Sequence, residues 1–179
     1  LTTVYRVHGN GKILVSNQFK PTKDLIRFGM QGQVPGEYNQ MGFYGRGPGE
    51  NYIDRKTGSA IGIYNGHVKN FTHDYVRPQE NGNHTDVRWM ALTNKKGKGL
   101  VFNKGEDRFL ETSAWPYSQE ALDRAEHIHE LKDEDTITFN VDYGQRGVGG
   151  DHPGLAALHD EFKLKKGKNY HYSFWISPV

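Results

Sequence analysis

The sequence predicts an all-β protein, an antiparallel sandwich with one short helix. Three observations predict this class. Apolar and polar residues alternate with a period of two in several segments, as is typical of strands with one buried face. Turn-forming Gly and Asn residues separate these segments, and only one stretch has the features of a helix.

Each element has its own sequence signal. Alternation predicts a half-buried strand with one polar face at residues 136–143. Three hairpins are expected, each from two alternating segments joined by a glycine-containing turn. They lie at residues 5–19, 87–102 and 162–176.

The helix is expected directly after Ser118, whose side chain is a suitable N-cap. Glu120 favours the first turn, and Ala121, Leu122 and Ala125 form the apolar side. Residues 44–66 and 144–159 interrupt the strand pattern and are expected to be long irregular loops, which in compact domains are usually functional or packed.

Composition limits the function classes. The 179 residues predict one domain over 1–179, and a net charge of +2 argues against a nucleic-acid partner. The chain has no cysteine, which excludes disulfides, thiolate catalysis and iron–sulfur clusters. No apolar run is long enough to span a bilayer, so no membrane partner is expected, and the compartment stays undetermined.

Two polar segments are interpreted as structural. The glycine-rich residues 45–55 lack the Gly-Lys-Ser/Thr ending of a phosphate-binding loop. Glu50 and Asp54 are expected to pair with Arg46 and Arg55 in a charge-assisted network that fixes this loop. The second segment, a turn at residues 75–82, contains Arg77 and Glu80 and is expected to stabilise the fold.

A third polar segment, residues 146–152, is rich in glycine. Asp151 and His152 at its end are suited either to hydrogen-bond a sugar hydroxyl or to bind a neighbouring backbone, and the residues alone favour the structural reading. His127 and His129 are two residues apart, a spacing that would place both on one face of a strand. A zinc site is nevertheless not expected, because surface histidines are far commoner than metal centres.

These motifs resemble the C-terminal small-chain domain of family 2 glycoside hydrolase β-galactosidases. The resemblance rests on four ordered motifs and covers essentially the whole chain. They are Gly-Pro-Gly-Glu-Asn-Tyr-Ile-Asp-Arg at 47–55, Tyr-Val-Arg-Pro-Gln-Glu-Asn-Gly at 75–82, Tyr-Ser-Gln at 117–119 and Gly-Val-Gly-Gly-Asp at 147–151.

The resemblance implies that the all-β fold is a galactose-mutarotase-like antiparallel supersandwich, which follows a (β/α)₈ barrel in the full enzyme. The two catalytic glutamates of the retaining mechanism belong to that barrel, so no catalytic residue is expected here and the chain alone is expected to be inactive. No cofactor is expected in this domain, because the family's Mg and Na bind elsewhere. In the family the domain begins well before the strand expected at residues 3–8, so we expect a fragment without the domain's first strands, and the start at Leu1 rather than Met fits this.

The resemblance also assigns the polar segments. Five residues are implied to lie beside the substrate, namely Gly149, Gly150, Asp151, His152 and Gly154. Many relatives carry a Trp at the position of Gly154, and glycine cannot supply that stacking face. Five others keep the assignment to a structural loop network that their residue types already favour, namely Glu50, Asp54, Arg55, Arg77 and Glu80.

The expected function is that of a non-catalytic β-galactosidase domain that completes the active-site cleft and stabilises the chain. Its expected partners are the rest of the β-galactosidase chain, a β-galactoside at the cleft and further copies in a homo-oligomer. Two alternatives share the fold, a stand-alone carbohydrate-binding module and a mutarotase-like epimerase. An epimerase needs an acid/base pair, and no spacing in the sequence singles one out.

Overall fold

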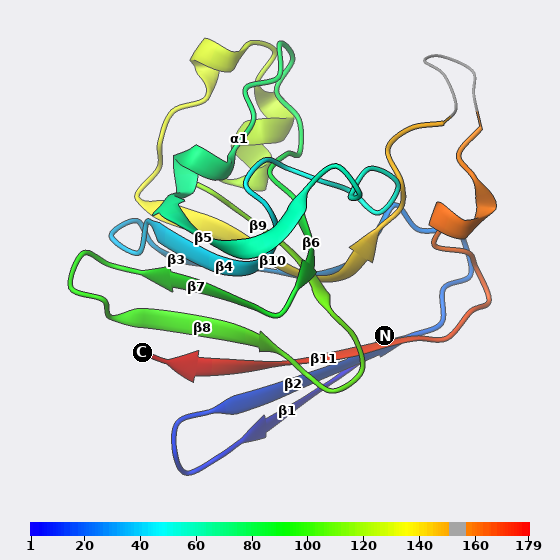
Figure 1. Cartoon of the computed structure of the whole chain (residues 1–179), viewed down its shortest axis with the longest axis horizontal. Helices are drawn as coiled ribbons and strands as arrows, with labels where there is room; N and C mark the ends of the chain where they lie inside the picture. The colour runs from blue at the N-terminus through cyan, green and yellow to red at the C-terminus, as the bar shows by residue number, and fades with distance from the viewer. Residues whose placement is uncertain (151–156) are drawn as a thin grey trace.

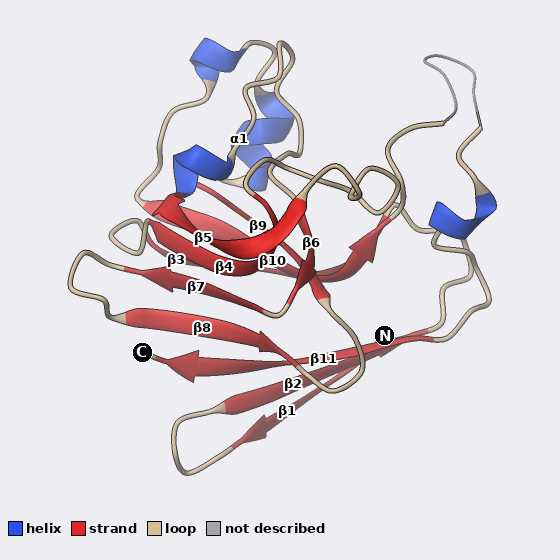
Figure 2. Cartoon of the chain, viewed as in Figure 1, coloured by secondary structure: helices blue, strands red, loops and turns tan. Residues whose placement is uncertain are grey.

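Two antiparallel sheets pack face to face (Figures 1 and 2), as predicted. The computed structural model of the chain describes residues 1–150 and 157–179. The larger sheet has seven strands in the order β1-β2-β11-β8-β7-β4-β5, and the smaller has four in the order β3-β10-β9-β6. The strands are β1 (Thr2–Val7), β2 (Ile13–Phe19), β3 (Arg27–Pro35), β4 (Gln40–Gly47), β5 (Ala60–His67), β6 (His84–Val87), β7 (Trp89–Thr93), β8 (Gly99–Lys104), β9 (Leu110–Trp115), β10 (Thr136–Gln145) and β11 (Tyr170–Pro178).

The helical elements are short. Within the described residues the one α-helix is α1 (Gln119–Arg124), and the side chain of Ser118 caps it as predicted by accepting a hydrogen bond from the Ala121 amide. Three 3₁₀ turns accompany it, η1 (Val68–Phe71), η2 (Ile128–Glu130) and η3 (Asp160–Phe162). In this part of the chain, none of the helices is long and apolar enough to cross a membrane.

Two of the three predicted hairpins are confirmed. β1 pairs with β2, and β7 pairs with β8. Their turns contain Gly11 and Gly97, whose φ angles of 81° and 78° are in the left-handed region that glycine adopts most easily.

The third hairpin prediction, at residues 162–176, is wrong. Residues 160–162 form η3 instead, and Leu164 makes a single isolated bridge with Leu25. The physical reason is that β2 pairs with β11 from Tyr170 to Ile176, and this ladder occupies one edge of the strand. Residues 162–164 pair instead, through Leu164, with Leu25.

The prediction of an irregular segment over residues 44–66 is also wrong for most of its length. β4 and β5 pair antiparallel from Gln40↔His67 to Gly47↔Ala60, and only residues 48–59 between them are irregular. Glycine has a low intrinsic propensity for strands, so glycine-rich segments are not expected to form them. Here β4 is hydrogen-bonded to β5 on one side and to β7 on the other, and this pairing outweighs the low propensity of its glycines.

The apolar core lies between the two sheets and is rich in aromatic rings. Phe28 of β3 packs edge-on against Tyr172 of β11, with ring centroids 5.4 Å apart. Farther along, Phe43 stacks on His84 at 4.1 Å. Other fully buried side chains of this core include Val15, Met90, Leu92, Phe102, Leu110 and Val141.

The four-stranded sheet is covered on its second face as well. We predicted a half-buried strand with a polar face at 136–143, but Thr138, Asn140 and Asp142 of β10 are all buried. The loops and α1 lie over this face (Figure 1), where Trp115, Tyr117 and Leu122 form a second small apolar cluster. The polar residues are therefore buried in hydrogen bonds, such as the one from Asn140 to Ser113 Oγ at 2.8 Å.

Candidate functional site

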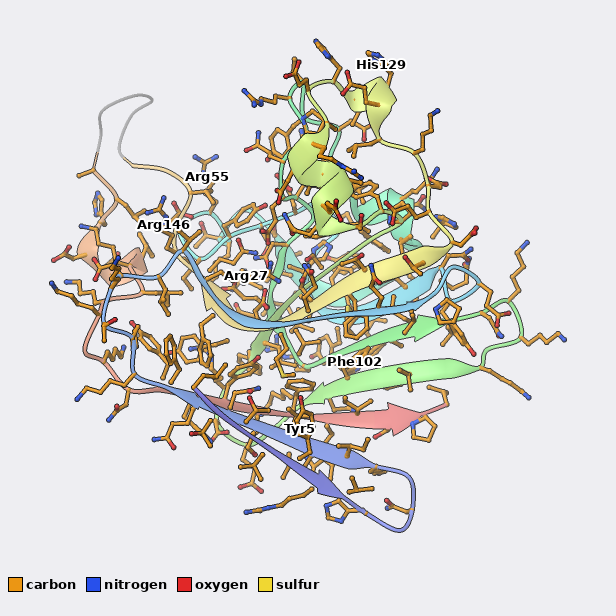
Figure 3. The ribbon with its side chains drawn as sticks, turned by 180° about the vertical axis from the view of Figure 1, so that it is seen from behind. Tyr5, Arg27, Arg55, Phe102, His129 and Arg146 are labelled. Carbon is orange, nitrogen blue, oxygen red and sulfur yellow. The ribbon has the colours of Figure 1, made fainter. Side chains whose placement is uncertain are left out.

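Most of the predicted site residues that the structure describes meet at one end of the four-stranded sheet. There the loop at residues 48–59 and the turn at residues 72–83 lie beside the segment 146–150 (Figure 3), which leaves the end of β10. Figure 3 shows Arg27, Arg55 and Arg146 at this end of the molecule. We call these residues and their contacts the loop cluster.

Glu50 joins the loop to the turn. Its carboxylate accepts hydrogen bonds from the Tyr75 hydroxyl, from the Gly82 amide at 2.8 Å and from the Tyr52 hydroxyl at 3.4 Å. Burial and the bond to Glu50 raise the pKa of Tyr75 to about 12, so this phenol stays protonated and remains a donor. Glu50 is thereby fixed by three donors from two segments.

Asn51 fixes the same loop to β6 from within. Its amide nitrogen donates to the carbonyls of Arg46 and Gly49, and its Oδ1 accepts from the amide and the hydroxyl of Thr85. The side chain is 1% exposed. The free-energy cost of burying its polar atoms is offset because each of them makes hydrogen bonds.

Arg27 of β3 makes two ion pairs. Its guanidinium lies 2.7 Å from Glu80 Oε1 of the turn and 2.8 Å from Asp142 Oδ2 of β10. Gln145 donates a further hydrogen bond to Glu80 Oε1 at 3.1 Å. Burial raises the pKa of the fully buried Asp142 to about 7, although Arg27 opposes that shift.

A second buried carboxyl, Glu111, lies directly opposite Asp142 in the pairing of β9 with β10. Its Oε2 accepts from the Asn83 side chain at 3.0 Å and from the Gln145 amide at 3.1 Å. Burial raises the pKa of Glu111 to about 7, and the two hydrogen bonds only partly oppose the shift.

Asp54 holds the start of the predicted substrate-adjacent loop. Its Oδ2 accepts from the Gly149 amide at 2.9 Å. A Cβ atom on Gly147 would lie 2.8 Å from the Asp54 carboxyl, and one on Gly149 would lie 2.4 Å from the Arg55 guanidinium. The approach to the short Asp54 side chain explains the glycine at position 147, whereas at position 149 the end of the long Arg55 side chain can move aside.

The other predicted site residues lie elsewhere or beyond this cluster. Arg46 does not pair with Glu50 or Asp54; it binds Asp86 at 2.6 Å, and Lys56 binds the same carboxylate at 2.9 Å. Arg77 is exposed and makes no hydrogen bond or ion pair within residues 1–150 and 157–179. Gly150 is exposed, whereas Asp151, His152 and Gly154 lie outside the described residues.

The predicted histidine pair is not on a strand. His127 is the residue before η2 and His129 lies within it, and their rings stack with centroids 5.6 Å apart. Among the residues that the structure describes, no group of three His, Asp or Glu side chains is placed to hold a metal ion.

Sequence reasoning missed five members of the loop cluster, namely Arg27, Asn83, Glu111, Asp142 and Gln145. One signal was present, because an Asp within a strand is unfavourable unless a partner compensates it. The identity of that partner is not readable from the chain, since Arg27 lies 115 residues away in sequence.

The chemistry of the loop cluster is that of a structural network. Each of its carboxylates, those of Glu50, Asp54, Glu80, Glu111 and Asp142, already accepts a hydrogen bond or forms an ion pair. A general base needs an oxygen within hydrogen-bond reach of a substrate proton. These carboxylates instead bind groups of the neighbouring loops and strands, which is a structural role.

Fold and site together define a β-sandwich whose loops are anchored by buried ion pairs at one end of the smaller sheet. Residues 1–176 match the family described as the β-galactosidase small chain. The chain belongs to that family.

Relatives named β-galactosidase match the chain along nearly its full length. The protein of Priestia megaterium is 35% identical over 178 residues, which cover 98% of this chain and 17% of that protein. The protein of Lactobacillus delbrueckii subsp. bulgaricus is 39% identical over 183 residues, which cover 100% of this chain and 18% of that protein. The chain thus spans less than a fifth of the length of these relatives.

Proposed function

We propose that this chain serves as a non-catalytic part of a β-galactosidase, where it completes one wall of the active-site cleft and stabilises the larger chain. The observation that carries the proposal is the match of residues 1–176 to the β-galactosidase small chain. The loop cluster supports it, because its carboxylates bind loops rather than stand free as acid and base.

The proposed partners follow from the same role. They are the rest of a β-galactosidase chain, a β-galactoside at the cleft and further copies in a homo-oligomer. The segment proposed to lie beside the substrate starts at Gly149 and Gly150, and Asp54 holds its first residue. We further propose that the chain itself needs no cofactor, so a chelator should leave its melting temperature unchanged.

Two measurements test the role. The purified chain should not hydrolyse nitrophenyl β-galactoside. A chimera in which residues 1–179 replace the matching segment of the Lactobacillus delbrueckii β-galactosidase should be soluble and should hydrolyse the same substrate. The matched control is the Lactobacillus delbrueckii enzyme that carries its own segment between the same two engineered junctions.

Two results would contradict the proposal. One is turnover that co-purifies with the chain alone. The other is a folded chimera that lacks activity although the reinserted control is active. A polarimetric assay of galactose mutarotation is run in parallel, because acceleration by the chain alone would favour the epimerase alternative.

A further inference from the structure

The outer face of the seven-stranded sheet carries a continuous row of side chains that the core does not use. Residues that pair directly across neighbouring strands point to the same face. Successive pairs from β1 to β5 give the row Arg6, Leu14, Trp175, Asn103, Trp89, Tyr44 and Ile63. Trp175 and Trp89 are two strands apart, which corresponds to about 10 Å.

Trp175 lies between two hollows on this face. One, of about 550 Å³, is lined by Trp175 together with residues of β1, β2 and the 105–107 segment. The other, of about 440 Å³, is lined by Trp175, His8, Lys12 and Asn103. The His8 ring lies 5.2 Å from the indole, so the Trp175 ring is supported at its side.

The wall of the larger hollow is fixed in advance. Asp107 Oδ2 accepts a hydrogen bond from the Ser173 hydroxyl at 2.7 Å and lies 3.4 Å from His171 Nδ1. Within the described part of the chain, Asp107 Oδ1 and the Trp175 indole N–H have no hydrogen-bond partner. One acceptor and one donor are therefore available at the rim of an aromatic surface.

The charges around the hollows balance. Arg6 and Lys12 contribute two positive charges, and Glu106 and Asp107 contribute two negative charges. A strongly charged ligand would be attracted by one pair and repelled by the other. The surface is better suited to a neutral ligand that has both an apolar face and hydroxyl groups.

We infer that this face binds a neutral oligosaccharide, with one pyranose ring against Trp175 and beside Asn103, and with the hydroxyls of a neighbouring ring on Asp107 and His171. A pyranose has an apolar face of C–H groups and a rim of hydroxyls, which matches an indole bordered by hydrogen-bonding groups. The residues that line the two hollows include none of the loop-cluster carboxylates, so this site is distinct from the segment at Gly149 and independent of the proposed function.

The three tryptophans provide a direct test. Lactose and β-1,4-galactotetraose are titrated into the ¹⁵N-labelled chain, and the three indole N–H resonances are followed by NMR. We expect the Trp175 resonance to shift in a saturable way. Trp115 is the internal control, because it is fully buried and its indole N–H donates to the Asn81 carbonyl at 2.8 Å.

Variants separate the site from general effects. Trp175→Ala should weaken binding of galactotetraose about tenfold, and Asp107→Asn should weaken it less. Tyr5→Ala is the matched control, since Tyr5 is an aromatic residue of β1 that is 57% exposed and points to the other side of the sheet. It should leave the affinity unchanged.

Three outcomes would overturn the inference. The first is a Trp175 resonance that stays unshifted up to high sugar concentration. The second is equal affinity of Trp175→Ala and the unmodified chain. The third is a Trp175 shift that follows protein concentration without sugar, which would identify this face as a contact between copies. An inactive β-galactosidase chimera would leave all three readouts unaffected, so the two proposals fail separately.

Discussion

At the scale of single residues, Gly29 of β3 shows how tightly the loop cluster is built. A Cβ atom at this position would lie 1.6 Å from Asp142 Oδ1 and 2.8 Å from the Asp142 backbone. Any side chain would therefore displace the carboxylate that pairs with Arg27. The absence of a side chain at position 29 is what allows a buried ion pair between neighbouring strands.

We expect Gly29→Ala to destabilise the chain by about 3 kcal/mol, because it overpacks the site and disturbs a buried ion pair. Denaturant unfolding measures the effect. Gly58→Ala is the control, since nothing lies within 4 Å of a Cβ there. Equal stability of the two variants would show that the Arg27–Asp142 pair tolerates displacement.

Glu111 makes stability depend on pH. Its pKa is raised by burial from the ordinary 4.5 to about 7 in the folded chain. Between these values the folded state binds more protons than the unfolded state, so stability falls as pH rises from about 4.5 to 7 and then levels off. The contribution of this carboxyl is on the order of 3 kcal/mol.

Glu111→Gln should reduce that loss. The amide oxygen of Gln still accepts hydrogen bonds, but it carries no charge that burial would penalise. We expect unfolding curves at pH 5 and pH 8 to differ less for this variant than for the unmodified chain. Glu37→Gln on the exposed surface serves as the control and should keep the original difference. A Glu111→Gln variant with an unchanged difference would mean that another group causes the pH dependence.

At the scale of elements, α1 shows that a local signal works when its partners are close in sequence. Ser118 Oγ accepts from the Ala121 amide at 3.2 Å and donates to Glu134 at 2.8 Å. Leu122 then packs against Trp115 and Tyr117. The cap residue and the apolar position both lie within a few residues, so the sequence alone predicted the helix.

Ser118→Ala should destabilise the chain by about 1 kcal/mol, the usual cost of losing an N-cap. Ser118→Thr keeps the hydroxyl and should stay close to the unmodified chain. The melting temperatures of the three proteins measure the effect. If Ala and Thr have the same effect, packing of Leu122 rather than the cap determines the stability of α1.

The strands were predicted less evenly than the helix. The hairpins β1–β2 and β7–β8 were found because each has its turn and both its strands within about twenty residues. β4 and β5 were missed because their glycines suppress the strand signal, while their stability comes from ladders with each other and with β7. The alternation in β10 correctly predicted a polar face. That this face is buried could not be predicted, because α1 and loops from other parts of the chain cover it.

At the scale of the whole molecule, the loop cluster connects segments that are far apart in sequence. Asp54 holds Gly149 across 95 residues, and Glu50 holds Gly82 across 32. Gly149 is the first of the residues proposed to lie beside the substrate, so in the proposed β-galactosidase these contacts would fix the position of that residue. A change in Asp54 should therefore affect substrate handling more than the stability of the fold.

We expect Asp54→Ala in the chimera to lower kcat/KM for nitrophenyl β-galactoside about tenfold, because the Gly149 amide loses its acceptor, at a cost of about 1 kcal/mol or more. Lys95→Ala in the exposed β7–β8 turn is the control and should behave like the parent chimera. If Asp54→Ala leaves kcat/KM unchanged and only lowers the melting temperature, the contact is purely structural.

The sequence by itself determined the all-β class, the two local hairpins, the capped helix and, through four ordered motifs, the family. These features depend on alternation, turn residues and motif order, which are all local properties of the chain. Only the tertiary structure decided that Asp142 pairs with Arg27, that Asp54 holds Gly149 and that Trp175 lies between two hollows. Such features depend on residues that are far apart in sequence, and which distant segments lie side by side is decided by tertiary packing rather than by a local pattern.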